Sequence, residues 1–498
     1  MSDQPLAVID IGSNSGRMII VRSPTGRHLE TLGEGRAPLR LASDLAATGS
    51  IGPAAFERTV QCVDDFLAHG RAAGVARTIA VATAAVRDAD NGEEFIGRVR
   101  THTHVDIDVI DGAREAELAF LGAVHSLPVH SGLLLDVGGG SIELTRFRDR
   151  RLTKAWTLPV GALLMADRFF NEDPPARSER RKLVDHIGDA IRDSALPTMT
   201  RNEGLAGTGG TIRNLAKMDR RERSYPLSRL HGYVLALSRV DELISLLSSR
   251  PLAKRAQLAG LNPDRADSIV AGAIVLHTIM EAMGAEEITV SGKGLREGIA
   301  MEALMPEMPS PVDVRAASIR GLAGRFASWE PPRAERRAAL AAEIFDATSI
   351  SRDGDAKELL THAAAILDAG AALDAYNRHE HAGAAVLAGD LSGFSHPQLA
   401  FIAAILRRAD KEDAGVKPLR ALLRTYDPTT VTRAATALAI ADAVDMRLAP
   451  DASASVRSTK TTISVVGPLV AGRWSELLSS RARTTLGRAF AVKTREDE

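Results

Sequence analysis

A six-residue pattern, Asp-x-Gly-x-x-Ser, occurs twice in the chain, and each copy separates two hydrophobic segments. The copies are Asp10-Ile-Gly-Ser-Asn-Ser15 and Asp136-Val-Gly-Gly-Gly-Ser141. Glycine, serine and asparagine between two apolar strands predict a β-hairpin with a polar tip. Two such hairpins, each at the start of an α/β segment, indicate two duplicated domains that face each other across a cleft.

Strands, glycine turns and amphipathic helices alternate through roughly the first 300 residues, which is typical of an α/β fold. Strands are expected at Leu6–Ile11, Arg17–Arg22, Thr78–Ala82, Ile107–Ile110, Leu133–Val137, Ile142–Phe147 and Ile288–Ser291. From about Val312 onward, long helices rich in Ala, Leu and Arg take over, with few strands before Thr461–Val466. The three prolines of Met305–Pro311 mark the boundary between these two regions.

The two hairpin tips are suited to binding phosphate. Consecutive backbone N–H groups in such a turn can converge on one anion, and the serine hydroxyls add donors. The aspartate at each strand end supplies hard oxygen, which suits Mg²⁺. Two further glycine clusters, Gly207-Thr-Gly-Gly-Thr211 and Ser291-Gly-Lys-Gly294, lie between a strand and a helix. The first would place its amides at a helix N-terminus, which favours anions, although each cluster alone is also explained by a tight turn.

Composition limits the cellular setting. The 498 residues include 62 basic and 63 acidic side chains, so any attraction for a polyanion must be local. The single cysteine, Cys62, lies in a helical pattern and is expected in the core, which fits a reducing compartment. The chain enters a strand at Leu6 without an apolar leader, and no uncharged apolar run is long enough to span a bilayer. We expect a cytoplasmic protein that binds neither membranes nor nucleic acid.

The chain resembles the exopolyphosphatase/guanosine pentaphosphate phosphohydrolase (Ppx/GppA) family of the sugar kinase, heat-shock ATPase and actin superfamily. The resemblance extends from residue 5 to about residue 305. The matching blocks, in the family's order, are Asp10–Ser15, Ala82–Ala89 with Asn91-Gly92, Gly112–Leu118, Asp136–Glu143, Gly207–Thr211 and Gly294–Gly298. It implies two duplicated actin/ribonuclease H-like domains, residues 1–126 and 127–307, with an interdomain cleft. An all-α HD-like domain at 312–450 and a small α+β segment at 451–498 would follow.

The helical part resembles that family's C-terminal domain more faintly, and this domain is itself similar to metal-dependent HD phosphohydrolases. The matching segments are Ile366–Gly370, Arg378–His381 and Asp390–Ser395. Where those enzymes have adjacent His and Asp ligands, this chain has Leu367 and Asp368, so one imidazole ligand for a second metal is missing. We interpret the domain as a substrate-channel and dimerisation element. His379 and His381 are expected at the surface or at an interface.

The resemblance implies a role for each site residue. Glu115 would orient and deprotonate the attacking water, and Arg87 would bind the transferred phosphoryl group. Glu143 lies two residues after Ser141, so both side chains address the same face of a strand. The expected metal ligands, for Mg²⁺ or alternatively Mn²⁺, are Asp10, Asp136 and Glu143. The expected substrate contacts are Ser13, Asn14, Ser15, Arg87, Gly138, Gly139, Gly140, Ser141, Thr208 and Gly209.

From the residues alone, Glu115 and Arg87 each have a second interpretation. A glutamate in the first turn of a helix also interacts favourably with the helix dipole. An arginine followed by Asp88 and Asp90 is also explained by a surface ion pair. The family resemblance is what favours the catalytic interpretation of both residues.

The resemblance implies an exopolyphosphatase that releases orthophosphate from the ends of inorganic polyphosphate. The same site acting on guanosine pentaphosphate (pppGpp) is the nearest alternative, and the sequence does not separate the two. An aromatic content of 4% gives little sign of a base-stacking pocket, which favours polyphosphate. An ATP-dependent kinase of the same fold and a non-enzymatic sensor are more distant alternatives. The family also implies a homodimer.

Overall fold

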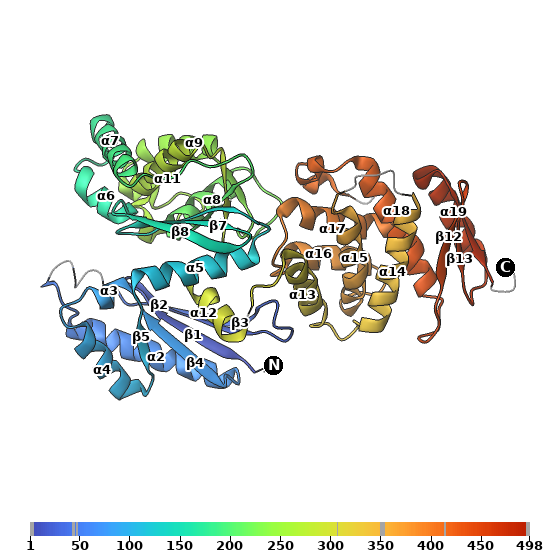
Figure 1. Ribbon diagram of the computed structural model, residues 1–498, viewed down its shortest axis with the longest axis horizontal. Coiled ribbons are helices and arrows are strands. Elements are labelled where there is room, and N and C mark those ends of the chain that lie inside the picture. The colour runs from blue at the N-terminus through green and yellow to red at the C-terminus, as the bar shows by residue number, and fades with distance from the viewer. Residues whose placement is uncertain are drawn as a thin grey trace. The chain divides into compact units, whose positions relative to one another are not determined.

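The computed structural model describes residues 4–41, 45, 48–305, 307–348, 354–412 and 415–494 (Figure 1). The chain divides into two compact units. The first unit contains Met1–Tyr225 and Arg229–Val314, and the second contains Pro226–Ser228 and Arg315–Glu498. Within the described residues, no helix combines the length and the apolar character needed to cross a membrane.

The first sheet of the first unit has five strands in the order β3-β2-β1-β4-β5. Their bounds are β1 Leu6–Ile11, β2 Ser15–Arg22, β3 Glu30–Pro38, β4 Arg77–Ala82 and β5 Ile107–Val109. Strands β1, β2 and β3 are antiparallel neighbours, whereas β4 and β5 continue the sheet parallel to β1. Four of these strands are where the sequence predicted them. β3 was not predicted, because most of its side chains are exposed or half-buried and give no apolar alternation.

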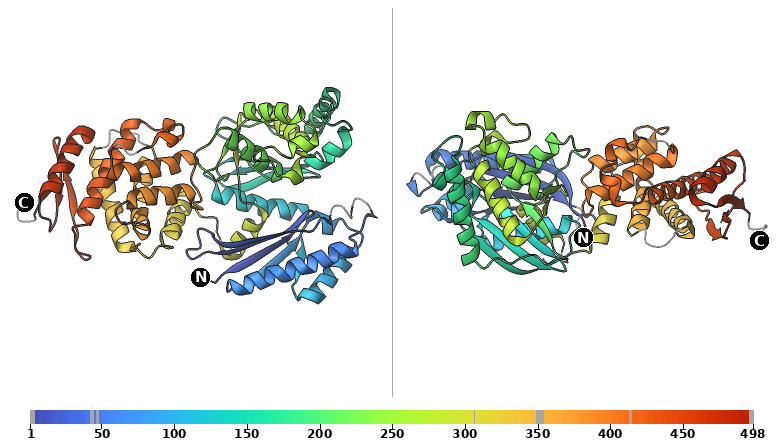
Figure 2. Two further views of the ribbon diagram at one scale, coloured as in Figure 1. Left: turned by 180° about the vertical axis from the view of Figure 1, so that it is seen from behind. Right: turned by 90° about the horizontal axis from the view of Figure 1, so that it is seen from above.

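Helices cover both faces of this sheet, as Figures 1 and 2 show. They are α2 Pro53–Ala72, the short α3 Ala84–Arg87, α4 Gly92–Thr103, α5 Gly112–Ser126 and α12 Leu295–Leu304. Successive strand residues point to opposite faces, so Ile9 packs with the core under α2 and Val8 with the core under α5 and α12. Cys62 is buried in the α2 core, which confirms its prediction. Helix α12 packs on this sheet although it follows the last strand of the second sheet in the chain.

The second sheet has six strands in the order β10-β11-β9-β6-β7-β8. Their bounds are β6 Gly132–Val137, β7 Ile142–Arg148, β8 Arg151–Leu158, β9 Gly204–Thr208, β10 Val234–Ala236 and β11 Glu287–Val290. The strands β6, β7 and β8 are antiparallel, and β9 and β11 follow parallel to β6. The first sheet has the same order and directions in β1 to β5. The predicted duplication, the cleft and the boundaries between the first two domains stay predictions.

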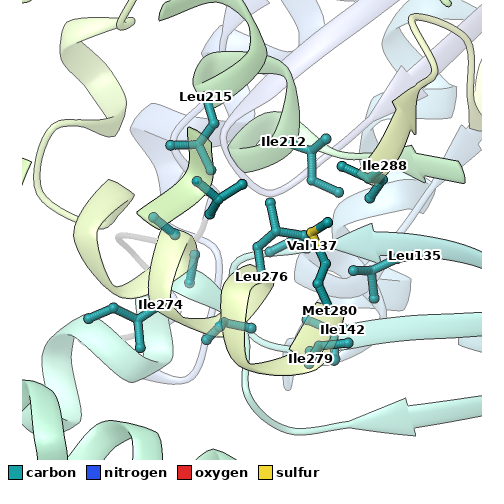
Figure 3. Packing of buried hydrophobic residues seen from close by; sticks show 14 of the residues in the cluster. Leu135, Val137, Ile142, Ile212, Leu215, Ile274, Leu276, Ile279, Met280 and Ile288 are labelled. Carbon is teal, nitrogen blue, oxygen red and sulfur yellow. The ribbon is translucent and has the colours of Figure 1, made fainter. Parts of the chain in front are cut away.

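Helix α11, Ile269–Met283, fills the core against the second sheet. Figure 3 shows Ile274, Leu276, Ile279 and Met280 of this helix packed with side chains of the sheet and of α8. Because α11 is apolar on nearly all sides, it is a central helix and not a surface helix. The surrounding helices are α6 Ala162–Phe169, α7 Arg177–Asp193, α8 Gly210–Glu222, α9 Leu237–Ser248, α10 Leu252–Arg255 and the 3-10 turn η1 Pro263–Arg265.

The second unit is a helical body followed by a small sheet of order β12-β13-β14. Its elements are α14 Pro331–Thr348, α15 Ala356–Ile366, η2 Leu367–Ala372, α16 Arg378–Ala388, α17 His396–Asp410, η3 Lys417–Leu419, η4 Leu422–Thr425, α18 Pro428–Asp445, β12 Ser455–Ser458, β13 Thr462–Val466, α19 Arg473–Leu486 and β14 Ala489–Lys493. The division between the units falls within α13, Pro311–Ala323. The predicted strand near the C-terminus is β13, and its two neighbours were not predicted. His379 and His381 were predicted at the surface or at an interface. His379 is buried, so a surface position is wrong for it, whereas His381 is half-buried, and the interface stays a prediction.

Candidate active site

The two hairpin tips close with the same hydrogen bond. The N–H of Gly12 donates to the carbonyl of Ser15 at 3.3 Å, and the N–H of Gly138 donates to the carbonyl of Ser141 at 3.0 Å. These are equivalent positions of the repeated pattern, so the residues that the two copies share form the same turn. A Cβ on Gly138 would lie 2.8 Å from the Ser141 carbonyl oxygen, which explains why glycine is needed there.

The carbonyl groups of the second tip are occupied by the start of α6. Gly138 accepts from the N–H of Ala162 at 3.0 Å, Gly139 accepts from Leu163 at 2.9 Å, and Gly140 accepts from Gly161 at 3.1 Å. Among the described residues, no acceptor is found for the N–H groups of Gly139 and Gly140. With the carbonyls tied to α6 and the amides left over, the tip is an arrangement that favours an anion.

Glu115 lies in the first turn of α5, where Asp111 caps the helix by accepting from the N–H of Arg114 at 2.8 Å. Burial is the main cause that raises the pKa of Glu115 to about 7, and the negative charge of Asp10 is the second. The charges of Asp136 and Glu143 raise it further. Glu115 therefore interacts with carboxylates at both hairpins, which are more than 120 residues apart in the chain. A carboxylate with a pKa near neutrality is suited to general-base catalysis.

The three predicted metal ligands are also desolvated carboxylates. Burial raises the pKa of Asp10 to about 6, against the lowering effect of Arg296 and Arg17. Burial likewise raises the pKa of Asp136 and of Glu143. Asp136 and Glu143 are directly opposite each other on β6 and β7, and the Ser141 hydroxyl donates to Oε1 of Glu143 at 2.5 Å. Repulsion within this acidic group would be relieved by a cation.

The donor set fits Mg²⁺ in its chemistry, because it consists of hard carboxylate oxygens. In the described part of the chain, no three His, Cys, Asp or Glu side chains are grouped closely enough to hold a metal ion by themselves. Mg²⁺ commonly keeps several water ligands and uses one or two carboxylates, so such a site does not require a closed protein shell. Metal binding by Asp10, Asp136 and Glu143 stays a prediction.

Arg87 ends the short helix α3 and lies beside Glu115. Its Nη1 donates to the carbonyl of Ile110 at 3.0 Å and lies 3.7 Å from Oε2 of Glu115. Its Nε lies 3.3 Å from Oδ1 of Asp88. The surface ion pair with Asp88 and the approach to Glu115 occur together. The structure is therefore compatible with both interpretations of Arg87, the ion pair and the catalytic role.

The other predicted substrate contacts differ in their surroundings. Ser13 is half-buried, Asn14 is exposed, and the Ser15 hydroxyl accepts from Nε of Arg17 at 3.3 Å. Thr208 is buried and donates to the carbonyl of Lys293 at 3.4 Å, so its hydroxyl is engaged within the protein. Gly209, with φ of 95°, packs so tightly that a Cβ would lie 2.6 Å from Oδ1 of Asp136. This contact places the N-terminus of α8 beside the acidic group.

Four arginines near the site were not predicted. They are Arg17 on β2, Arg213 on α8, Arg265 in η1 and Arg296 on α12. Burial lowers the pKa of Arg17 to about 10, and the charges of Arg213 and Arg296 lower it further. A Cβ on Gly210 would lie 2.7 Å from Nη2 of Arg265, so this guanidinium covers the N-terminus of α8. Arg17 follows the first motif, and Arg296 lies inside the Gly294–Gly298 block. The charges of Arg17 and Arg296 act on Asp10, and those of Arg213 and Arg265 act on Asp136, although none of the four forms a direct ion pair with another described residue.

The helix that carries Glu115 is held by a close crossing with α12. A Cβ on Gly122 would lie 2.1 Å from the carbonyl oxygen of Gly294, and a Cβ on Gly298 would lie 1.8 Å from the carbonyl oxygen of Leu118. Backbone therefore touches backbone, and only glycine permits it. The crossing joins the chain that leaves the second sheet to the helix that positions the predicted base.

Comparison with known proteins now identifies the family. A model described as the Ppx/GppA phosphatase family matches residues 19–307, which is more than half of the chain. The chain belongs to the Ppx/GppA phosphatase family. Relatives include Exopolyphosphatase 1 of Mycobacterium tuberculosis, 30% identical over 318 residues that cover 63% of this chain and 92% of the relative. Exopolyphosphatase 1 of Mycobacterium leprae is 30% identical over 324 residues, covering 64% of this chain and 95% of the relative.

Solved structures of Ppx/GppA proteins agree with this membership. The Aquifex aeolicus family member is 28% identical and matches with a TM-score of 0.56, covering 62% of this chain and 99% of that chain. An exopolyphosphatase from Cytophaga hutchinsonii is 27% identical, with a TM-score of 0.55, covering 62% of this chain and all of that chain. The mixed α/β architecture of the first unit is therefore that of the family. The HD-like character of the second unit stays a prediction.

Proposed function

We propose that this Ppx/GppA protein is a Mg²⁺-dependent exopolyphosphatase that hydrolyses the terminal phosphoanhydride bond of inorganic polyphosphate. The observation that carries the proposal is the chemical environment of Glu115. Its pKa is near neutrality, and it stands among carboxylates from both hairpins and beside Arg87. The names of the mycobacterial relatives support the same reaction.

The positions of the residues suggest a role for each of them. Glu115 accepts a proton from the attacking water, and the free N–H groups of Gly139 and Gly140 donate to the terminal phosphate. The guanidinium of Arg87 stabilises the negative charge of the transferred phosphoryl group. Mg²⁺, held by oxygens of the three predicted ligands, would neutralise charge on the phosphate oxygens. The products are orthophosphate and a polyphosphate shorter by one unit.

The four unpaired arginines support a substrate with several consecutive phosphates. These guanidiniums are half-buried and form no direct ion pair with another described residue, which is costly, and the cost falls when an anion binds. Arg17, Arg213, Arg265 and Arg296 together with Arg87 would offer charge for more than one phosphate. Hydrolysis of pppGpp at the same site remains the second candidate, since it presents the same terminal anhydride. The proposal also includes a cytoplasmic location and a homodimer, and sedimentation of the purified chain would test the homodimer.

Phosphate release from polyphosphate, pppGpp and ATP, with Mg²⁺ and after chelation, tests the proposal. We expect the fastest release from polyphosphate and none after chelation. Glu115→Gln keeps the shape but removes the base, so turnover should fall at least about 100-fold. Glu117→Gln, on the exposed side of the same helix, is the matched control and should keep wild-type turnover. Metal-independent hydrolysis, or full activity of Glu115→Gln, would defeat the mechanism.

A further inference from the structure

Helix α19 of the second unit has one face that is exposed along its whole length. The exposed residues that follow one another along this face are Arg473, Leu477, Ser480, Thr484 and Gly487. Alternating steps of four and three residues are the spacing of the contact line between two helices of a coiled coil. Leu477 is 63% exposed, which leaves an apolar side chain near the middle of this line. We call these five residues the α19 seam.

Two opposite charges flank the α19 seam. Glu476 and Arg483 are both exposed, and their separation of seven residues, nearly two helical turns, puts them on the same side of the seam. Neither forms an ion pair with another described residue. They are also too far apart for the pairing at three or four residues that stabilises a single helix. Each charge therefore lacks a partner within its own copy.

A second copy of α19 running antiparallel would satisfy both charges. With a two-fold axis beside Ser480, Glu476 of each copy lies level with Arg483 of the other, so two equivalent ion pairs form. In a parallel pair, by contrast, Glu476 would face Glu476 and Arg483 would face Arg483, which is unfavourable. The face is thus complementary to itself in one direction only.

We propose that α19 is a dimerisation helix that packs antiparallel against α19 of a second copy of this chain. The inference rests on the homodimer that the proposed function includes, and it names the contact. Leu477 would be covered by the seam of the second copy. The exposed Val470, which precedes the helix and whose carbonyl accepts from the indole N–H of Trp474 at 3.1 Å, lies at the edge of the same contact.

The opposite side of α19 is attached to the helical body. Arg481 donates to the carbonyls of Arg408 and Ala409 at 2.6 and 2.9 Å. The hydroxyl of Thr485 donates to the hydroxyl of Thr436 at 2.9 Å. Because α17 and α18 hold this side, the exposed face is already ordered before a second copy arrives, which lowers the cost of association.

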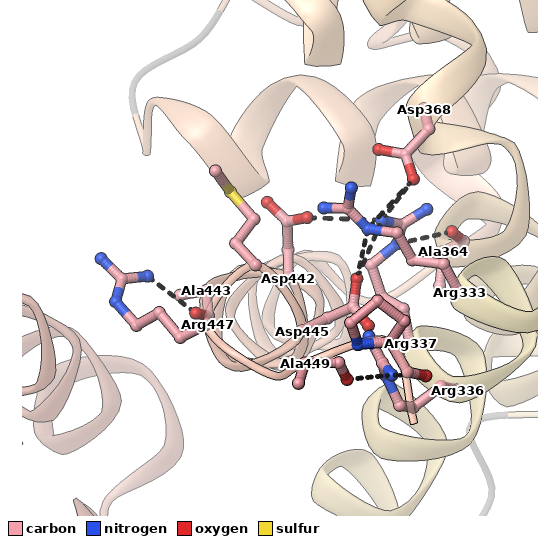
Figure 4. A network of polar contacts seen from close by, with 12 residues as sticks. Arg333, Arg336, Arg337, Ala364, Asp368, Asp442, Ala443, Asp445, Arg447 and Ala449 are labelled. Carbon is pink, nitrogen blue, oxygen red and sulfur yellow. Dashed lines mark hydrogen bonds and ion pairs between the residues drawn. The ribbon is translucent and has the colours of Figure 1, made fainter. Parts of the chain in front are cut away.

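Helix α18, which supports α19, is itself anchored to α14 by buried charges (Figure 4). Asp445 accepts from the Nε atoms of two arginines of α14, each at 2.8 Å. Nη1 of the fully buried Arg337 lies 3.5 Å from Asp445 and 3.6 Å from Asp442. The pKa of Asp442 is held at about 2, against its burial, by the hydrogen bond from His379 and by the charges of Arg378 and Arg337. These carboxylates stay ionised at neutral pH, so the support under α19 persists.

Charge exchange followed by sedimentation equilibrium tests the contact on the full chain. Glu476→Arg and Arg483→Glu each bring two pairs of like charges together and should raise the dissociation constant of the dimer about tenfold. The double variant restores both pairs with exchanged signs and should dimerise within about threefold of wild type. Glu57→Arg makes the same charge change on the exposed side of α2 and should dimerise like wild type. Unchanged unfolding midpoints would exclude misfolding as the cause.

Cysteine cross-linking tests the direction of the helices. The native Cys62 is buried, so a new surface thiol reacts alone. Ser480→Cys places two thiols beside the axis and should form a disulfide-linked dimer on mild oxidation. Arg473→Cys is the matched control, because the two positions would lie about 20 Å apart along an antiparallel pair and should not link.

The outcomes separate this contact from the homodimer itself. A wild-type chain that sediments as a monomer would remove the homodimer and this contact with it. A dimer that ignores both single charge changes, or that links through Arg473→Cys as well as through Ser480→Cys, would leave the homodimer in place and overturn the antiparallel α19 contact.

Discussion

Replacing Gly298 by alanine should lower turnover while the chain stays folded. The new Cβ would lie 1.8 Å from the carbonyl oxygen of Leu118 and 2.6 Å from its carbonyl carbon. Both are backbone atoms of α5, so no flexible side chain can move aside. Helices α5 and α12 have to separate at the point where they now touch.

The size of this displacement follows from the contact. Ordinary van der Waals contact begins near 3.4 Å, so the two backbones must move apart by about 1.6 Å. Glu115 is one helical turn from Leu118 and moves with it. A misplacement of about 1 Å can cost roughly 100-fold in rate, whereas overpacking costs only about 1–3 kcal/mol of stability. We therefore expect a loss of about 100-fold in kcat and a modest fall in the unfolding midpoint.

Phosphate release and thermal unfolding should be measured on the same preparations. Gly97→Ala, on α4, is the matched control, because a Cβ there meets nothing within 4 Å. It should keep full activity and unfold at the same or a slightly higher temperature, since alanine favours helix. Wild-type turnover in Gly298→Ala would refute the view that this crossing positions Glu115. Unfolding of the variant would show that the crossing serves stability instead.

Three further outcomes are expected. Gly209→Ala should reduce activity more than tenfold, because its Cβ would lie 2.6 Å from Oδ1 of Asp136 at a φ of 95°, and unchanged phosphate release would contradict this. The charge of Arg87 lowers the pKa of Glu115, so Arg87→Met should move the acid limb of the pH–rate profile to higher pH. An unmoved limb would show that the charge of Arg87 does not affect the catalytic base. The folded pKa of Asp442, about 2, lies below its unfolded value, so its stabilisation of the helical unit is complete above about pH 4 and is lost as the pH falls toward 2. Unfolding by acid should show this, and Asp442→Asn should flatten the loss.

Much of the first unit could be predicted because its central strands are read from apolar segments. Strands β1 and β6 are buried along nearly their whole length, and the hairpin tips that follow them are specified by a few neighbouring residues. Strands β3, β8 and β12 escaped prediction because their side chains are mostly exposed. Their pairing is made by backbone hydrogen bonds, which leave no side-chain pattern.

Parts of the candidate site were beyond sequence reasoning because they join distant segments. Arg213 and Arg265 carry no motif, and only folding brings their charges near Asp136. Gly122 and Gly298 are separated by more than 170 residues, and nothing local shows that their helices cross. In the helical unit, the missing imidazole before Asp368 was visible in the sequence, but the arginine that now faces this carboxylate was not.

The sequence by itself determined the turns, most of the central strands and the kind of chemistry, because each depends on neighbouring residues and their backbone preferences, whereas the buried central strand β9 was not predicted. The tertiary structure alone decided which charges meet. Burial and proximity set the pKa of Glu115, brought four arginines near the carboxylates of the site without a direct ion pair, and put Arg337 beside three aspartates. Electrostatic energies depend on distance and desolvation in space, and neither quantity can be read from positions along the chain.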